Sequence, residues 1–160
     1  ETFRNFSKFN KNYENYSRNI KEISNHRKDW IYNQFKKITK EFKNLKKIGV
    51  LGLAYKENTN SIKNSPSISF IKKISLNNKY TINVFDPKIK KLSEHSNINI
   101  CKNINDVMKN CEILFVATPW KIFKKIKLKK FKNIKAIIDP YNLINFSTDQ
   151  KKIKHISMGN

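Results

Sequence analysis

Short apolar runs alternate with amphipathic and polar stretches along most of this chain. A short apolar run between turn residues is typical of a strand buried on both faces, and apolar residues at helical spacing predict a helix. The expected strands are 48–53, 80–85, 98–101, 112–117, 136–138 and 155–158. The expected helical segments are 67–76, 104–109, 122–126 and 128–131. This alternation predicts an α/β fold with a doubly wound, mostly parallel, Rossmann-like sheet.

A long helix is expected to precede the sheet. From about Ser17 to Leu45 the apolar residues form one stripe at helical spacing, with lysine and arginine opposite. We therefore divide the chain into a helical region, 1–45, and a sheet domain, 46–160. A stripe of this length needs a cover, and a partner subunit or a second domain is the favoured one. Periodicity leaves open the alternative that the stripe packs on the sheet of this same chain.

The stretch 47–66 is where the candidate chemistry gathers, because it is typical of a buried strand, a polar turn and a helix start. Ser65 suits the N-cap of that helix, and Pro66 suits its first position. Ligands of open α/β sheets bind at the edge where parallel strands end. We expect loop amides and the helix N-terminus to attract an anion there, with Lys56 and Lys63 adding positive charge. The residues thus predict a phosphate-bearing ligand, although the chain lacks a GxGxxG dinucleotide motif.

Charge raises a rival function. Lysine and arginine number 34 against 12 acidic residues, so the formal net charge is +22. Such an excess is typical of a protein with a polyanionic partner, and a basic nucleic-acid-binding module is the alternative function. The lysines are spread along a chain rich in asparagine and isoleucine, which indicates a compositional cause. Trp30, Tyr32, Trp120 and Phe123 lie on apolar faces of the expected elements, which favours core positions over base stacking.

The cysteines and the hydropathy exclude several classes. Cys101 and Cys111 have neither the spacing of a metal site nor that of a disulfide framework. Cys111 precedes an apolar strand and is expected in the core. No apolar run approaches transmembrane length, and no signal peptide is visible. We expect no metal, no membrane partner and a reducing, cytoplasmic setting.

One segment carries a family resemblance. GLAYKENTNSIKNSP, residues 52–66, resembles the G-x-A-[FY]-K-x-x-T-x-x-x-[RK]-x-S-P signature of the UDP-glucose/GDP-mannose dehydrogenase family, in its C-terminal nucleotide-sugar-binding domain. The segments YTINVFDPKI, CEILFVATPWKIF and KAIIDPYNLI agree with that domain in order and spacing. Upstream, IKEISNHRKDWIYNQFKKI resembles the end of the family's central dimerisation helix, with Asn25, Arg27 and Lys28 in place. The resemblance implies a homodimer through the long helix.

The resemblance also implies a chemistry. Family enzymes oxidise the C6 alcohol of a nucleotide sugar to a carboxylate in two NAD-dependent hydride transfers, with a cysteine holding a thiohemiacetal and then a thioester. That cysteine and the NAD-binding half are expected outside this chain, since neither cysteine here matches the nucleophile. We therefore expect a C-terminal fragment that binds a nucleotide sugar weakly and does not turn over. Glu1 aligns with the family's water-activating acidic residue, or is simply a terminal surface glutamate.

Five residues are the expected binding residues. Lys56 matches the family lysine that reaches the sugar and diphosphate, and Tyr55 matches the aromatic residue beside it. Lys63 takes the place of an arginine that touches the cofactor, keeping the charge but losing the bidentate fork. Many members have aspartate-glycine-arginine where this chain has Asp-Pro-Tyr, so Tyr141 or Asn142 is expected to supply a hydrogen bond instead.

That departure leaves the sugar open among UDP-glucose, a UDP-N-acetylhexosamine and GDP-mannose, with a UDP-sugar favoured. A third candidate function is a non-catalytic dimerisation fragment, in which the helix of 17–45 pairs with its copy.

Overall fold

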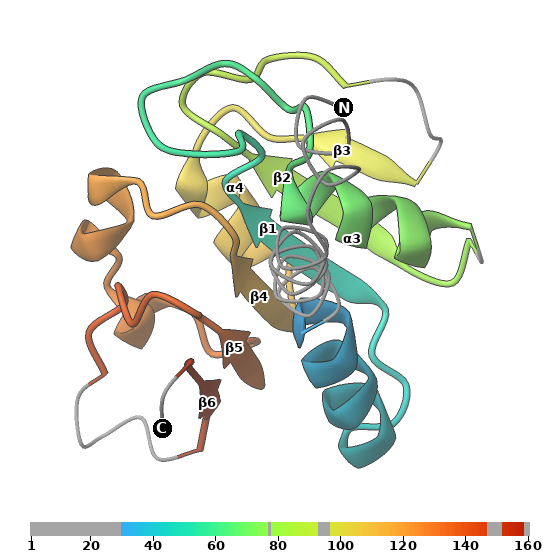
Figure 1. The fold of residues 1–160 in the computed structure, drawn as a ribbon. Coiled ribbons are helices and arrows are strands. Elements are labelled where there is room, and N and C mark those ends of the chain that lie inside the picture. Colours follow the sequence, from blue (N-terminus) through green and yellow to red (C-terminus); the bar gives the residue numbers. More distant parts are fainter. Residues whose placement is uncertain (1–29, 77, 93–96, 147–151, 159–160) are drawn as a thin grey trace, which may run out of the picture.

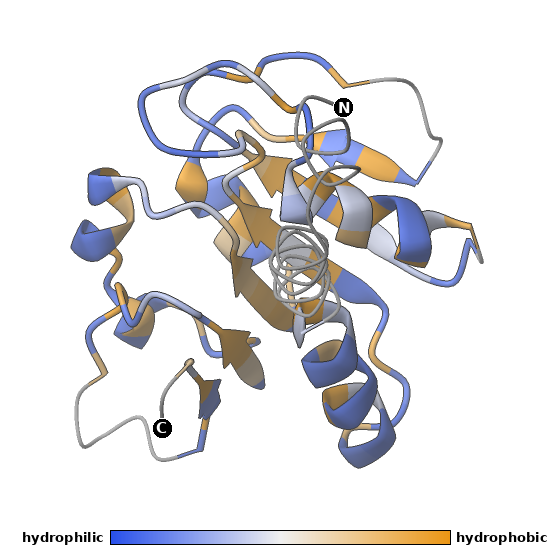
Figure 2. Cartoon of the chain, viewed as in Figure 1, coloured by the Kyte–Doolittle hydropathy of each residue, from blue (hydrophilic) through white to orange (hydrophobic). Residues whose placement is uncertain are grey.

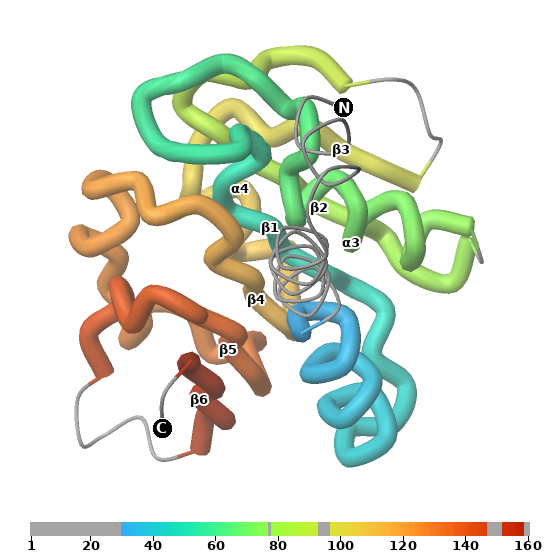
Figure 3. The backbone as a smooth tube through the Cα atoms, viewed as in Figure 1, coloured from blue at the N-terminus to red at the C-terminus, as the bar shows by residue number. Residues whose placement is uncertain are grey.

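The computed structural model describes residues 30–76, 78–92, 97–146 and 152–158. Within these residues six strands, all parallel to their neighbours, form one sheet in the order β3-β2-β1-β4-β5-β6. The strands are β1 (Lys47–Leu51), β2 (Thr81–Phe85), β3 (Ile98–Ile100), β4 (Ile113–Val116), β5 (Ala136–Ile138) and β6 (Lys154–Ile156). Figure 3 shows the chain entering the sheet at its centre, moving out to β3 and returning to β4 beside β1. The predicted α/β parallel sheet is confirmed.

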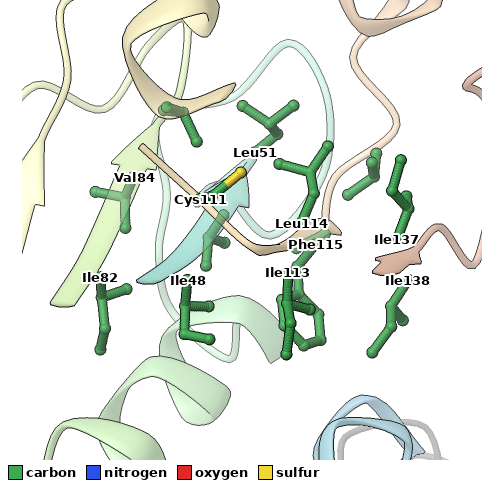
Figure 4. Close-up of a cluster of buried hydrophobic side chains, with 14 of the residues drawn as sticks. Ile48, Leu51, Ile82, Val84, Cys111, Ile113, Leu114, Phe115, Ile137 and Ile138 are labelled. Atoms are coloured by element: carbon green, nitrogen blue, oxygen red, sulfur yellow. The ribbon is translucent and has the colours of Figure 1, made fainter. Parts of the chain in front are cut away.

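The helical segments cover both faces of this sheet (Figure 1). They are α3 (Pro66–Ser75), α4 (Ile104–Lys109), the 3-10 segments η1 (Lys121–Lys125) and η2 (Leu128–Lys130), and a helix over 30–41. The helix of 30–41 and α3 lie on the face toward which Ile48 and Ile113 point, and α4 lies on the opposite face (Figure 4). Asn103 caps α4, because its side-chain oxygen accepts the N–H of Asp106 at 3.0 Å.

The core explains why the central strands are apolar along both faces (Figure 2). Beneath β4, Phe115 packs on Phe70 of α3 and on Phe35 of the preceding helix, with ring centroids 4.3 and 6.0 Å apart. Phe35 also meets Tyr80 edge-on at 5.3 Å. Aromatic pairs in this geometry add roughly 0.5–1.5 kcal/mol each beyond their buried area.

The apolar stripe of the long helix has a cover within this chain. Ile31, Phe35 and Ile38 are at most 6% exposed, because they pack on α3 and the sheet. For the described part of the helix, the favoured expectation that a partner covers the stripe is therefore wrong, and the alternative holds. The part of the predicted helix from Ser17 to residue 29 lies outside the described residues, so the homodimer and the boundary at residue 45 stay predictions.

Two local expectations need correction. The first strand ends at Leu51 rather than at Leu53, because Gly52 turns the backbone with φ +94°. Pro66 opens α3 as predicted, but the Ser65 side chain makes no cap hydrogen bond. Its hydroxyl instead pairs with the Ser67 hydroxyl at 2.8 Å.

Candidate functional site

A buried carboxylate holds the carboxyl edge of the sheet together. Asp86 follows β2 directly and is 1% exposed. Its Oδ2 accepts hydrogen bonds from the N–H groups of Leu53 (2.7 Å) and Ala54 (3.0 Å) and from Nε1 of Trp120 (3.1 Å). Its Oδ1 accepts the N–H groups of Lys88 (2.8 Å) and Ile89 (3.1 Å). One side chain therefore joins the segments that follow β1, β2 and β4.

The protonation of Asp86 follows from these contacts. Burial by itself raises the pKa of this carboxyl, but the four backbone N–H donors outweigh burial, and the net pKa is lowered. Asp86 is thus an anion whose carboxylate oxygens are hydrogen-bonded to donors of its own chain. In dinucleotide-binding domains an acidic residue in the same region binds the ribose; here the carboxylate holds loops instead.

A second contact closes the gap between the ends of β1 and β4. A Cβ on Gly52 would lie 2.5 Å from Cβ and 2.6 Å from the backbone nitrogen of Thr118. Thr118 is fully buried, and its hydroxyl donates to the carbonyl of Ala54 at 2.7 Å. The strand order reverses between β1 and β4, and Rossmann domains bind their ligand at such a switch point. Here Thr118 of the chain itself fills the space between the ends of these two strands.

For three amides of this loop, those of residues 53–55, these contacts correct the expectation that loop amides are available to an anion. The N–H groups of Leu53 and Ala54 donate to Asp86, and that of Tyr55 donates to the carbonyl of Ser61 at 2.8 Å. These three N–H groups are therefore not available to an anion, and exposed side chains are the candidates for positive charge at this edge. The candidates are Lys56 and Lys63.

The loop of 52–65 presents the predicted binding side chains outward. Tyr55 is 57% exposed, and Lys56 and Lys63 are exposed. Asn58 and Asn64 have φ of 62° and 59°, a left-handed conformation that asparagine tolerates better than most residues. The structure thus brings Tyr55, Lys56 and Lys63 onto one loop that leaves the carboxyl end of β1.

Tyr141 and Asn142 leave the sheet from a different strand. Asp139, at the end of β5, is fully buried and accepts the N–H groups of Tyr141 (3.2 Å) and Ile144 (2.8 Å). Asn142 adopts φ 51°, and Tyr141 is 47% exposed. Because β4 lies between β1 and β5, this turn and the loop of 52–65 flank β4 on the same edge. Glu1 lies outside the described residues.

Sequence reasoning missed the roles of Asp86, Thr118 and Asp139. Each was visible as a polar residue directly after an apolar strand, yet only as a strand end. The signal in the sequence is an aspartate at the end of an apolar run, where it is expected to be buried. A buried carboxylate needs hydrogen-bond donors, and backbone N–H groups can supply them. The donors themselves lie more than thirty residues away in the cases of Leu53 and Trp120.

The remaining polar candidates carry no site. Cys111 is fully buried as predicted, and burial raises the pKa of its thiol to about 12. Burial, with the charge of Asp106, also raises the pKa of Cys101. The described residues contain no group of three or more histidine, cysteine or acidic side chains that could hold a metal ion. A search of the same residues found no helix both long and apolar enough to cross a membrane.

The aromatic residues behind the nucleic-acid alternative are mostly core. Trp120 is 7% exposed and Phe123 is fully buried. Tyr32 is half-buried, and the ammonium groups of Lys36 and Lys73 lie 5.0 and 5.2 Å from its ring centroid. None of these three rings is a free stacking platform, and the fourth aromatic residue, Trp30, is partly buried against the core. The net charge is therefore the main support for that alternative.

The strand order defines an open α/β domain of the Rossmann class. At the carboxyl edge of its sheet this domain presents exposed side chains rather than a glycine-rich loop. Residues 49–146 match the UDP binding domain of the UDP-glucose/GDP-mannose dehydrogenase family. The chain belongs to that family.

Relatives and solved structures agree with this membership. UDP-glucose 6-dehydrogenase of Rickettsia conorii is 33% identical over 113 residues, which cover 66% of this chain and 26% of the relative. The enzyme of the same name from Rickettsia felis is 33% identical over 107 residues, or 24% of its length. The chain thus spans about a quarter of the length of these relatives.

Similarity in fold extends further. A UDP-N-acetyl-mannosamine dehydrogenase from Staphylococcus aureus superposes with a TM-score of 0.69 at 20% identity, covering 87% of this chain and 32% of that protein. A GDP-mannose dehydrogenase from Pseudomonas aeruginosa gives 0.58 at 15% identity, covering 89% of this chain and 32% of that one. At these identities the likeness concerns the fold.

Proposed function

We propose that this chain is the nucleotide-sugar-binding, C-terminal part of an NAD-dependent nucleotide-sugar 6-dehydrogenase. The observation that carries the proposal is the loop of 52–65. It projects an exposed Lys56 beside an exposed Tyr55 from the carboxyl end of the central strand of a UDP binding domain. An ammonium on a flexible stem suits a diphosphate, because it neutralises the charge without demanding one geometry.

The proposed roles follow the position of each side chain. We assign Lys56 to the diphosphate and sugar, and Tyr55 to the flank of the ligand. Tyr141 and Asn142, across β4, are assigned hydrogen bonds to the sugar. Their turn is fixed by Asp139, so a ligand would meet a preorganised turn there.

The oxidation itself is assigned to residues outside this chain. The nucleophilic cysteine and most of the NAD site belong to the remainder of the family's length. NAD, when bound, accepts the hydride. From this chain Lys63 fits a phosphate of that cofactor, because its side chain is exposed and it shares the loop with Lys56. A UDP-sugar is the proposed substrate class, and the sugar remains open.

Removing the Lys56 ammonium should weaken nucleotide-sugar binding selectively. We expect Lys56→Ala to raise the Kd for UDP-glucose, measured by calorimetry on the full chain, by about 10- to 100-fold, the usual range for one hydrogen bond to a charged group. Lys72→Ala is the matched control, because Lys72 is also exposed but lies in the last turn of α3. Equal weakening by both variants would mean that UDP-glucose is attracted by net charge alone, and would contradict the proposal.

A further inference from the structure

A cavity of about 330 Å³ lies away from the loop of 52–65, beside the carboxyl end of β2. Its walls come from Phe85, from the residues around the start of α4, and from η1, η2 and their junction. Figure 1 draws α4 in yellow and η1 and η2 in orange. The volume falls within the range of small-molecule sites, at its low end. Neither the loop of 52–65 nor the turn at Tyr141 lines this cavity, so it is separate from the proposed substrate residues.

The floor of the cavity is apolar and contains two aromatic rings. Phe85 and Phe131 are 8% and 7% exposed, and both line the cavity. Ile122 completes a wall and is 45% exposed, whereas its neighbour Phe123 is fully buried. A large apolar side chain left half in water at the mouth of a cavity loses that exposure when a flat apolar group enters. The floor therefore favours a ligand with a ring rather than a bare inorganic anion.

The rim of the same cavity is cationic. Lys125, Lys127 and Lys130 line it, and none of the lining residues is acidic. Asp106, in the first turn of α4, is the acidic neighbour, and its carboxylate accepts a hydrogen bond from the side chain of Asn103 at 2.9 Å. Three lysines among the lining residues, with no acidic residue among them, favour an anionic group such as a phosphate.

A polar group able to bind a base edge completes the lining. Asn105 is exposed and lines the cavity, and its amide offers both a donor and an acceptor. We propose that this cavity binds a nucleoside monophosphate, with the base against Phe85 and Phe131, its edge at Asn105 and its phosphate among the three lysines. Phe85 and Phe131 are too buried to stack face-on, and the Lys90 ammonium already lies 5.6 Å from the Phe85 ring centroid, so they offer the base an apolar floor rather than a stacking platform. An apolar floor, an amide and lysine side chains supply contacts for the base, its edge and the phosphate.

The test is a titration of the full chain with AMP at physiological salt, followed by calorimetry. AMP is the probe because it shares no base with the proposed UDP-sugar. We expect saturable binding that Ile122→Glu weakens by about tenfold or more, since the carboxylate enters the apolar wall and faces the phosphate. Leu76→Glu is the matched control: Leu76 is 80% exposed at the end of α3, and the change in net charge is identical. This variant should bind AMP within about twofold of the unaltered chain.

Three further titrations complete the test, one of the apolar floor and two that separate this proposal from the proposed function. Inorganic phosphate should bind about tenfold or more weakly than AMP, because it leaves the apolar floor unused. Lys56→Ala should leave AMP binding unchanged, and Ile122→Glu should leave UDP-glucose binding unchanged. The proposal is overturned if AMP binding does not saturate, or if phosphate binds as tightly as AMP. It is also overturned if Leu76→Glu weakens AMP binding as much as Ile122→Glu does, or if Lys56→Ala rather than Ile122→Glu abolishes AMP binding. Failure of UDP-glucose to bind at all would count against the proposed function alone.

Discussion

Replacing Gly52 by alanine lowers the free energy of unfolding by about 2–5 kcal/mol, as the expected sum of a left-handed backbone penalty and overpacking. The backbone at Gly52 has φ +94°, and the added Cβ would meet the backbone nitrogen of Thr118 at 2.6 Å. Thr118 cannot retreat easily, because it is fully buried and its hydroxyl is bonded to Ala54. Urea unfolding of the full chain, followed by circular dichroism, measures the loss.

Asn58→Ala separates the two causes. Asn58 has φ 62° but is exposed, so alanine there bears the backbone penalty without a clash, about 1 kcal/mol. If Gly52→Ala lost no more stability than Asn58→Ala, the contact with Thr118 would be soft, and the closed switch point would not be a rigid feature of this domain.

Replacing Asp86 by asparagine should have the other large effect. The carboxylate accepts five N–H donors on two oxygens, whereas asparagine offers one oxygen and turns an NH₂ group toward at least two of those donors. Each buried donor left without an acceptor costs about 1–3 kcal/mol, so we expect a loss of about 2–6 kcal/mol in urea unfolding at neutral pH. Asp106→Asn, at a partly exposed carboxylate on α4, should cost less than about 1 kcal/mol.

The same variant tests the pH dependence. Because the pKa of Asp86 is lower in the folded chain than the value of about 3.9 in the unfolded chain, its contribution is fully present above about pH 4 and is lost as the pH falls through the folded pKa. Burial raises the pKa of Glu112, but the N–H groups of Lys46 and Lys47 together with the Lys135 ammonium outweigh burial, so the net pKa is lowered as well. Asp86→Asn should therefore flatten the acid limb of the stability profile only in part. An unchanged acid limb would mean that Asp86 does not carry its charge in the folded state.

The sheet could be predicted from the sequence because its strands are short apolar runs that end in polar turns. Runs such as ILFV in β4 need no knowledge of distant residues, and the cap of α4 by Asn103 is local too. The early end of β1 could not be foreseen, because it depends on the fit of Gly52 against Thr118, far away in the chain. The cover of the long helix was missed because periodicity gives a stripe but not the surface that meets it.

The candidate site could be predicted only in part from the sequence. The position of Lys56 at the carboxyl edge follows from one strand and the turn after it. The pairing of the loop amides does not, because Asp86 accepts the N–H groups of Leu53 and Ala54 from a position 33 and 32 residues later in the chain. Asp86 directly follows the expected strand of 80–85, yet only the packed sheet shows that its carboxylate accepts hydrogen bonds from three loops.

The measurement that tests the central claim most directly is an amide chemical-shift map of the nitrogen-labelled chain during titration with UDP-glucose. We expect the largest shifts within residues 55–63 and at Tyr141 and Asn142, around the carboxyl ends of β1 and β5. Shifts confined to the opposite edge of the sheet, or to the helix of 30–41, would contradict that claim, because the ligand would then bind where Lys56 cannot reach.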